Sequence, residues 1–226
     1  MKFWITSVAA IFVLAAVARP VSADNLLSGL FGHGIKGSGD RVTESRDLPD
    51  FTKIRTRGAC DVYVTFGDTR SVSITFDDNL IDLIKTEVKG KTLRIYSDES
   101  YNSRKSCKVE ITVPKLVAIK SSGSGDFELS GFDDDSFDFS LSGSGDLTID
   151  GRVKELEISI SGSGDVDARR LIADEAYVSI SGSGDVLVHA KSVFDGSVSG
   201  SGDITFYGDP KDISRSVRGS GSIRRR

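Results

Sequence analysis

Ser122-Gly123-Ser124-Gly125-Asp126 is the first of five identical strings that decide the fold of this 226-residue chain. The other four occupy 142–146, 161–165, 181–185 and 199–203. Successive strings begin 20, 19, 20 and 18 residues apart, so one structural unit returns every 18–20 residues. A degenerate copy of the string follows at 219–222, and residues 57–64 resemble a first, degenerate unit. Self-similarity at such a period is typical of a solenoid.

Apolar and polar residues alternate on both sides of each string. After the first string Phe127 and Leu129 are apolar, and the same two positions are apolar after all the others. This period of two indicates two short strands in each unit, each with one apolar face. A single unit cannot bury that face, whereas units stacked about 4.8 Å apart as parallel strands share a continuous apolar core.

The sequence therefore predicts an all-β fold, a single-stranded parallel β-helix (solenoid) with coils of 18–20 residues. Connections between parallel strands favour the right hand, so we expect a right-handed helix. Left-handed coils of regular hexapeptides fit the irregular spacing less well. We divide the solenoid into N-terminal strands and a β-rich cap over 51–115 and repeat coils over 116–226. Asp77, Asp78 and Asn79 predict a short capped helical turn that plugs the open end.

The N-terminal 23 residues have the pattern of a signal peptide: Lys2, an apolar run and small residues before a cut after Ala23. Residues 24–50 are polar and Gly-rich and predict a flexible linker. No second long apolar stretch follows, so we expect no transmembrane span after cleavage. The protein is then exported, to the periplasm, the cell surface or the medium.

Composition and the scarcity of catalytic motifs argue against several functions. The formal charge of −4 gives no basic surface overall, so nucleic acid is not an expected partner. The two histidines, His33 and His189, lie in no nucleophile or metal motif. Repeated Ser and Asp invite a hydrolase interpretation, but a catalytic residue is normally unique. We therefore predict no catalytic residues, no cofactor and no enzyme activity.

The two cysteines of the chain, Cys60 and Cys107, both fall on the apolar parity of their segments. In an oxidising compartment such a pair is expected to form a disulfide. The loop it closes would add about 4 kcal/mol of stability in the chain-entropy model. Two buried free thiols are the alternative, and a zinc site lacks further ligands.

The parity of the strands also orients the repeated string. Both Gly face inward, where the chain turns and approaches its neighbours, while Ser and Asp face outward. The resulting candidate binding face consists of Ser124, Asp126, Ser144, Asp146, Ser163, Asp165, Ser183, Asp185, Ser201 and Asp203.

Stacking brings the aspartates into one column, where carboxylates about 4.8 Å apart repel by ~0.9 kcal/mol in water and ~3.5 kcal/mol at an effective dielectric constant of 20. We expect Ser hydroxyls and turn amides to offset this repulsion. Calcium between coils is the weaker alternative, because the GGxGxD nonapeptide of calcium-binding rolls is missing. Its candidate ligands are Asp126, Asp146, Asp165, Asp185 and Asp203.

Several features together resemble the head GIN domain family, described as autotransporter adhesin heads of bacteria. They are the SGSGD series, Arg46, Asp47 and Phe51 before the first strand, the 79–84 turn, and 109–114 with Leu116. The resemblance implies a β-helix outside the cytoplasm and an adhesin-like role, and it brings no catalytic residues. The chain departs from the pattern at Cys60, where the repeat has Gly.

The leading hypothesis is a non-catalytic binding or scaffold module whose Ser/Asp face contacts a glycan, an envelope component or a protein. One alternative is a polysaccharide-processing β-helix enzyme, which fold analogy alone supports. Another is a purely structural envelope protein. The sequence carries no indication of the oligomeric state.

Overall fold

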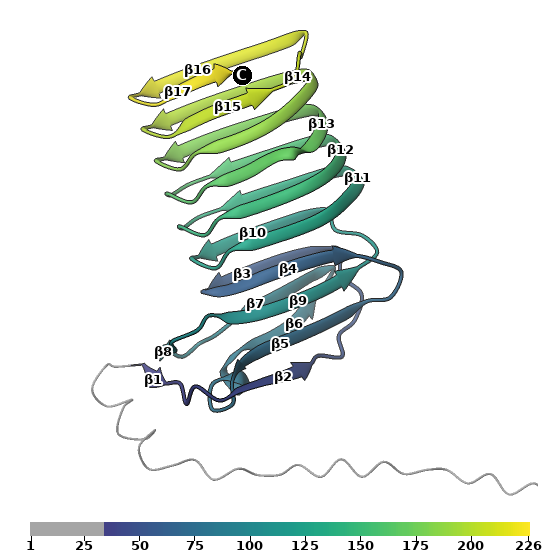
Figure 1. The fold of residues 1–226 in the computed structure, drawn as a ribbon, viewed down its shortest axis with the longest axis vertical. Helices are drawn as coiled ribbons and strands as arrows, with labels where there is room; N and C mark the ends of the chain where they lie inside the picture. The colour runs from purple at the N-terminus through teal and green to yellow at the C-terminus, as the bar shows by residue number, and fades with distance from the viewer. Residues whose placement is uncertain (1–33) are drawn as a thin grey trace, which may run out of the picture.

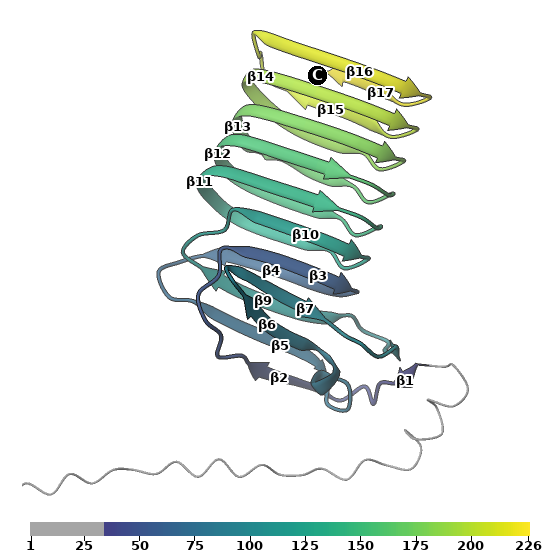
Figure 2. The same ribbon diagram turned by 180° about the vertical axis from the view of Figure 1, so that it is seen from behind.

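The computed structural model describes residues 34–226, which form a β-solenoid of about 5 turns. Coils rise one above another, and each coil is flattened into two layers of strands (Figures 1 and 2). The predicted all-β solenoid is confirmed. The signal peptide expected at 1–23 lies outside the described residues.

The repeat coils consist of long strands that pair in parallel with the coil above and the coil below. Sequence alternation predicts two short strands per unit, but four units are each one strand of 14 to 17 residues. Each long strand bends midway from one layer into the other, where its pairing register shifts. The strands of this part are β10 (Ala118–Gly123), β11 (Phe127–Leu141), β12 (Leu147–Ile160), β13 (Val166–Gly182), β14 (Val186–Gly200), β15 (Asp203–Tyr207), β16 (Asp212–Gly219) and β17 (Ser222–Arg225).

The N-terminal strands extend both layers downward, apart from the first and the eighth, which pair with each other as a separate two-stranded sheet. They are β1 (Ile35–Lys36), β2 (Arg41–Ser45), β3 (Lys53–Gly58), β4 (Cys60–Phe66), β5 (Ser71–Asp77), β6 (Lys85–Lys89), β7 (Thr92–Tyr96), β8 (Tyr101–Asn102) and β9 (Cys107–Val113). We call the first layer the one formed by β2, β5, β9, β4, the first halves of β11–β14, β15 and β17. The second layer consists of β6, β7, β3, β10, the second halves of β11–β14, and β16.

The core lies between the two layers. Inward rows of Val, Ile, Leu and Phe from every coil are buried, as the alternation predicts. The rings of Phe127 and Phe139 meet edge to face across the layers at 5.9 Å, and those of Phe194 and Phe206 stack at 4.0 Å. Each such buried side chain stabilises the stack by roughly 1.5 to 3 kcal/mol.

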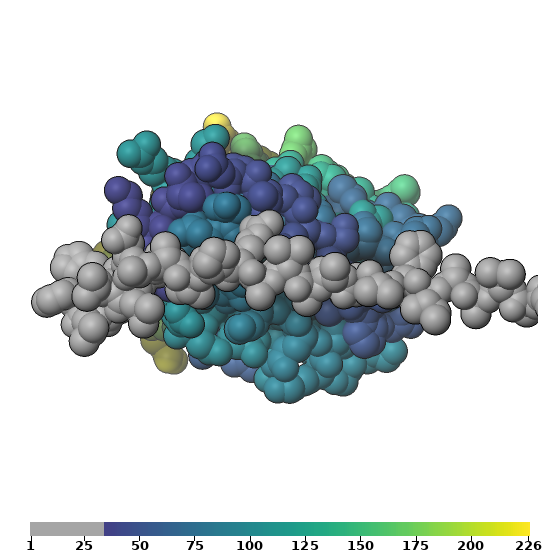
Figure 3. Space-filling model, turned by 90° about the horizontal axis from the view of Figure 1, so that it is seen from below, coloured from purple at the N-terminus to yellow at the C-terminus, as the bar shows by residue number. Residues whose placement is uncertain are grey.

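The N-terminal end differs from the prediction in two ways. Residues 51–115 do not sit as a separate cap, because β3 pairs with β10 and β4 pairs with β11 in continuous layers. Residues 41–45, expected in the linker, instead form β2, an edge strand antiparallel to β5. The linker prediction is wrong for this segment, since Val42 packs against the core. Figure 3 looks onto this end, where purple and teal N-terminal residues form the surface.

The predicted helical turn is present as a short 3-10 helix, η2 (Ile81–Leu83), but it is not capped as expected. Its N-cap residue is Leu80, which makes no side-chain cap bond. The polar residues before it tie down the incoming chain instead: Asn79 Nδ2 donates to the Lys36 carbonyl, and Asn79 Oδ1 accepts from the Ser38 amide. Leu80 and Ile81 are buried in the core. Within 34–226 no helix has the length and apolar character needed to cross a membrane.

Candidate binding surfaces

The SGSGD turns stack directly on one another along one edge of the solenoid. The Ser144 amide donates to the Gly123 carbonyl of the coil below at 3.0 Å, and the later turns repeat this bond. A Cβ atom at Gly143 would lie 2.0 Å from that carbonyl oxygen, and the other stacked Gly are equally crowded. The Gly are therefore required because backbone packs on backbone, as the inward parity predicts.

The repeated aspartates form a hydrogen-bonded column that we call the Asp ladder: Asp61, Asp126, Asp146, Asp165, Asp185 and Asp203. The amide of Asp146 donates to Oδ1 of Asp126 at 2.9 Å, and that of Asp165 to Oδ1 of Asp146 at 2.8 Å. The same bond joins every step from Asp61 upward. Each carboxylate thus has a backbone N–H directed at it, which offsets the repulsion along the column.

The repulsion between the carboxylates is offset by local hydrogen bonds, as expected, but backbone amides supply most of them and Ser hydroxyls supply few. The amide of the next aspartate supplies the bond, and Ser hydroxyls contribute only at the two ends of the ladder. Ser106 Oγ donates to Oδ2 of Asp61 at the bottom, and Ser222 Oγ donates to Oδ1 of Asp203 at 2.8 Å at the top. Arg224 also binds Oδ2 of Asp203 at 2.8 Å. The hydroxyl of Ser222, followed by its amide and by Arg224, lowers the pKa of Asp203. In the described part of the chain no three Asp, Glu, His or Cys side chains are grouped to hold a metal ion, and calcium between coils stays a prediction.

The structure brings all ten predicted face residues to this edge. The turn serines, which are Ser124, Ser144, Ser163, Ser183 and Ser201, are exposed, as are four of the five repeat aspartates. Asp203 is half-buried. In the Asp ladder between Asp126 and Asp185, the hydrogen bonds of the described residues use Oδ1 only, which leaves Oδ2 free to accept from a ligand.

A second line of hydroxyls lies on the outer surface of the second layer, and the sequence reasoning missed it. We call it the serine row: Ser140, Ser159, Ser179, Ser197 and Ser216. Its members are directly opposite one another in neighbouring coils, and Ser197 Oγ lies 3.2 Å from Ser179 Oγ. The signal was available, because four of the five SGSGD strings are directly preceded by Ser and one apolar residue, and only the first string, which follows Lys120 and Ser121, is not.

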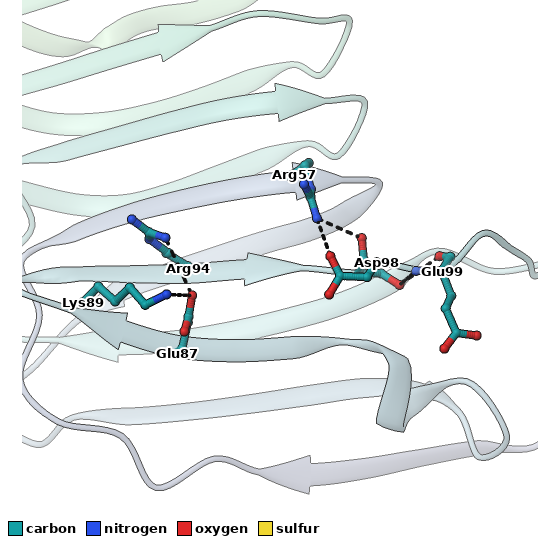
Figure 4. A network of polar contacts seen from close by, with 7 residues as sticks. Arg57, Glu87, Lys89, Arg94, Asp98 and Glu99 are labelled. Carbon is teal, nitrogen blue, oxygen red and sulfur yellow. Dashed lines mark hydrogen bonds and ion pairs between the residues drawn. The ribbon is translucent and has the colours of Figure 1, made fainter.

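Cationic side chains gather on the second layer below the serine row, and these too were missed. We call Arg55, Arg57, Lys89, Arg94 and Lys120 the cation cluster. Four of them, all except Lys120, line a cavity of about 400 Å³ over β3, β6 and β7. Figure 4 shows Arg57 directed at Asp98, and Lys89 and Arg94 directed at Glu87. These residues come from three separate parts of the sequence, β3, the β6–β7 hairpin and β10, with no motif to link them.

The two cysteines face each other in the interior. Cys60 is directly opposite Cys107 on the parallel strands β4 and β9, and both are buried. The thiols are free in this structure, so the predicted disulfide is not formed here. A hydrogen bond with Cys60, together with burial, raises the pKa of Cys107 far above its ordinary value. Burial and both thiols also raise the pKa of the neighbouring Tyr101.

The stacked coils, the glycine turns and the polar edge define a β-solenoid of repeated coils that pair in parallel. The family described as "Putative auto-transporter adhesin, head GIN domain" matches residues 50–210, and the chain belongs to this family. No curated protein matches the chain.

Three solved structures share the fold. A "putative adhesin" of Bacteroides fragilis is 28% identical, with a TM-score of 0.71 over 85% of this chain and 100% of its own. A "putative lipid binding protein" of Parabacteroides distasonis is 27% identical, with a TM-score of 0.57 over 85% of this chain and 99% of its own. A "putative adhesin" of Parabacteroides merdae is 17% identical, with a TM-score of 0.60 over 85% of this chain and 98% of its own, a likeness of fold alone.

Proposed function

We propose that this protein is an exported, non-catalytic binding module of the bacterial envelope, and that its turn serines and Asp ladder bind a glycan. The observation that carries the proposal is the register of the hydroxyls and carboxylates. The same Ser and Asp recur at every coil, about 4.8 Å apart, so the edge offers one polar contact repeated along a line. A polymer of sugar units repeats its hydroxyls in the same way.

The chemistry of the edge suits sugar hydroxyls. Each ladder carboxylate keeps Oδ2 as an acceptor, while the turn serines can donate or accept. Because Oδ1 is held by the next amide, the carboxylates are positioned before a ligand arrives.

Two comparisons bear on the class of ligand. The similar structure from Bacteroides fragilis, 28% identical, is described as an adhesin, which agrees with a binding role. Another is described as a lipid-binding protein. In the described part of this chain the large exposed hydrophobic side chains are Tyr63, Ile213 and Val217, which offer a lipid chain little apolar surface. We therefore favour a glycan.

Export is part of the proposal and rests on the signal-peptide pattern and on the adhesin-like family. In an oxidising compartment we expect Cys60 and Cys107 to lose two electrons and two protons to the thiol-oxidising machinery and form a disulfide. Residues directly opposite on neighbouring strands are about 4.8 Å apart, which lies within the Cα separation that a disulfide spans.

The test is a binding screen against immobilised envelope polysaccharides, neutral and acidic, with native protein and a triple variant. The variant carries Asp146→Asn, Asp165→Asn and Asp185→Asn, which keep an oxygen for the ladder bond and remove the charges. The control changes Asp47, Asp68 and Asp82 to Asn, since these carboxylates are exposed, lie away from the edge and change the net charge equally. We expect the first variant to lose at least tenfold in affinity and the control to bind normally. Equal binding by all three proteins would remove this edge from the function.

A further inference from the structure

We propose that the cation cluster is a second binding site, which holds an oxyanion group, carboxylate or phosphate, carried by a sugar. It lies on the outer surface of the second layer, on strands that precede the SGSGD repeats. The site is distinct from the Ser/Asp edge and does not depend on glycan binding there.

The first observation is a row of like charges. Lys120, Arg55 and Arg94 are directly opposite one another on β10, β3 and β7. Like charges in cross-strand neighbours destabilise a sheet. Among the described residues, the side chains of Arg55 and Lys120 form no ion pair or hydrogen bond. The row therefore lowers stability in the free protein, and an anion bound over it would relieve the repulsion.

The second observation is the shape and charge of the cavity. Its volume of about 400 Å³ is within the range of small-ligand sites, and its lining includes Tyr96 and Ser122. Four cationic side chains, Arg55, Arg57, Lys89 and Arg94, line it against two carboxylates, Glu87 and Asp98. The charge of the lining is thus positive in a chain whose formal charge is −4.

The third observation is that two guanidinium groups are prepared for a ligand. Arg57 lies over the ring of Tyr96 at 5.4 Å and donates to Asp98 Oδ1 at 2.7 Å, which fixes its position. The Nε atom of Arg94 is buried without a hydrogen-bond partner. A buried donor without an acceptor is unfavourable, and because Arg94 lines the cavity, a ligand oxygen there would satisfy it.

These features select the class of ligand. The planar donor fork of Arg matches the paired oxygens of a carboxylate or a phosphate. The cavity volume admits a single sugar unit beside the anionic group. Lys120 is also directly opposite Ser140, so the cavity lies at the end of the serine row.

The experiment is isothermal titration calorimetry of the full exported chain with inorganic phosphate, glucuronate and glucose at low ionic strength. We expect saturable binding of at least one of the two anions, weakened by added salt, and no binding of glucose. Glucuronate alone would identify a carboxylate-bearing sugar as the source, and phosphate alone a phosphate-bearing one. No saturable heat from either anion would overturn the proposal.

The variant for this test is Arg55→Gln with Arg94→Gln, and the control is Arg169→Gln with Arg170→Gln, exposed residues of β13 that change the charge equally. We expect the first variant to lose at least tenfold in anion affinity, while its thermal midpoint does not fall, because the substitutions remove like-charge repulsion. Equal loss in both variants would reduce the effect to net charge and contradict a site. The Asp146, Asp165 and Asp185 triple variant should bind the anion normally, which separates this site from the Ser/Asp edge.

Discussion

The amide of Asp165 donates a 2.8 Å hydrogen bond to Oδ1 of Asp146, so an aspartate in one coil is held by the backbone of the next. The same residue type thereby serves as acceptor for the coil above and as donor to the coil below. The hydrogen bond between stacked coils is therefore sufficient to explain why Asp recurs at this position, even without a ligand. The free Oδ2 atoms are then available for binding at no cost to the fold.

Removal of one ladder carboxylate should destabilise the stack modestly. Asp146→Ala leaves the amide of Asp165 without its protein acceptor, and we expect a loss of about 1 kcal/mol, since water can reach this exposed edge. Asp146→Asn should lose less because its side-chain oxygen can still accept. Urea unfolding curves of both variants and of Asp47→Ala measure this. An Asn variant as unstable as the Ala variant would mean that charge, and not the amide bond, holds the step.

A methyl group in the stacked turns should be far more damaging. Gly143→Ala places a Cβ atom 2.0 Å from the Gly123 carbonyl oxygen, and the neighbouring backbone cannot move without separating two coils. We expect a loss of about 3 kcal/mol or more. Gly67→Ala is the matched control, because its nearest neighbour is a Thr112 methyl carbon at 3.3 Å. Thermal unfolding followed by circular dichroism compares them, and similar midpoints would refute the close approach of the turns.

Calcium should make no difference to the stability of the edge. The Asp ladder is satisfied by backbone amides, and no metal-binding group of three such side chains occurs within 34–226. We expect the midpoint of thermal unfolding to be the same in excess chelator and in millimolar calcium. A rise of the midpoint that saturates with calcium, and is lost in the Asp146, Asp165 and Asp185 triple variant, would establish the alternative of cations between coils.

The cysteine pair predicts a pH dependence that reports its redox state. Under reducing conditions the pKa of Cys107 is raised above its ordinary value of 9.0 in the folded protein, while the unfolded chain ionises near that value. The corresponding stability is fully present below pH 9.0 and is lost as the pH rises above it. Cys107→Ala should reduce this alkaline loss.

The free energy of unfolding of the oxidised protein should be higher by about 4 kcal/mol. The loss of stability above pH 9.0 that comes from thiol ionisation should then be absent. Thiol titration of the unfolded protein, purified without reductant from its native compartment, measures the state directly. We expect no free thiols. Two free thiols per chain would show that the pair stays reduced despite its position on β4 and β9.

The repeat coils could be predicted from sequence because each coil obeys the same local rule. The parity that places Phe127 and Leu129 inward also places Gly125 inward and Asp126 outward, and the structure agrees at each of these positions. Parallel pairing followed from the period, since identical units can share a core only in register. The sequence did not reveal that each unit forms one long, bent strand in place of two short ones, because the apolar and polar alternation continues through the bend with little interruption.

The N-terminal part was harder to predict because no repeat fixes its pairing. Ser45 and Ser73 meet on antiparallel strands that no local pattern links, so β2 resembled a linker. The cation cluster was missed for the same reason: Arg55, Arg94 and Lys120 come together only through the pairing of β3 with β7 and β10. Sites built from distant strands need the topology before their residues can be associated.

The dependence of affinity on ligand length tests the central claim most directly. A polysaccharide bound in the screen is cut into oligosaccharides of increasing length, and the dissociation constant of each is measured by calorimetry. If stacked Ser and Asp residues form one continuous binding edge, affinity should rise with each unit until the oligosaccharide spans the five SGSGD turns, and then level off. A single sugar unit that binds as tightly as the longest oligosaccharide would contradict the account.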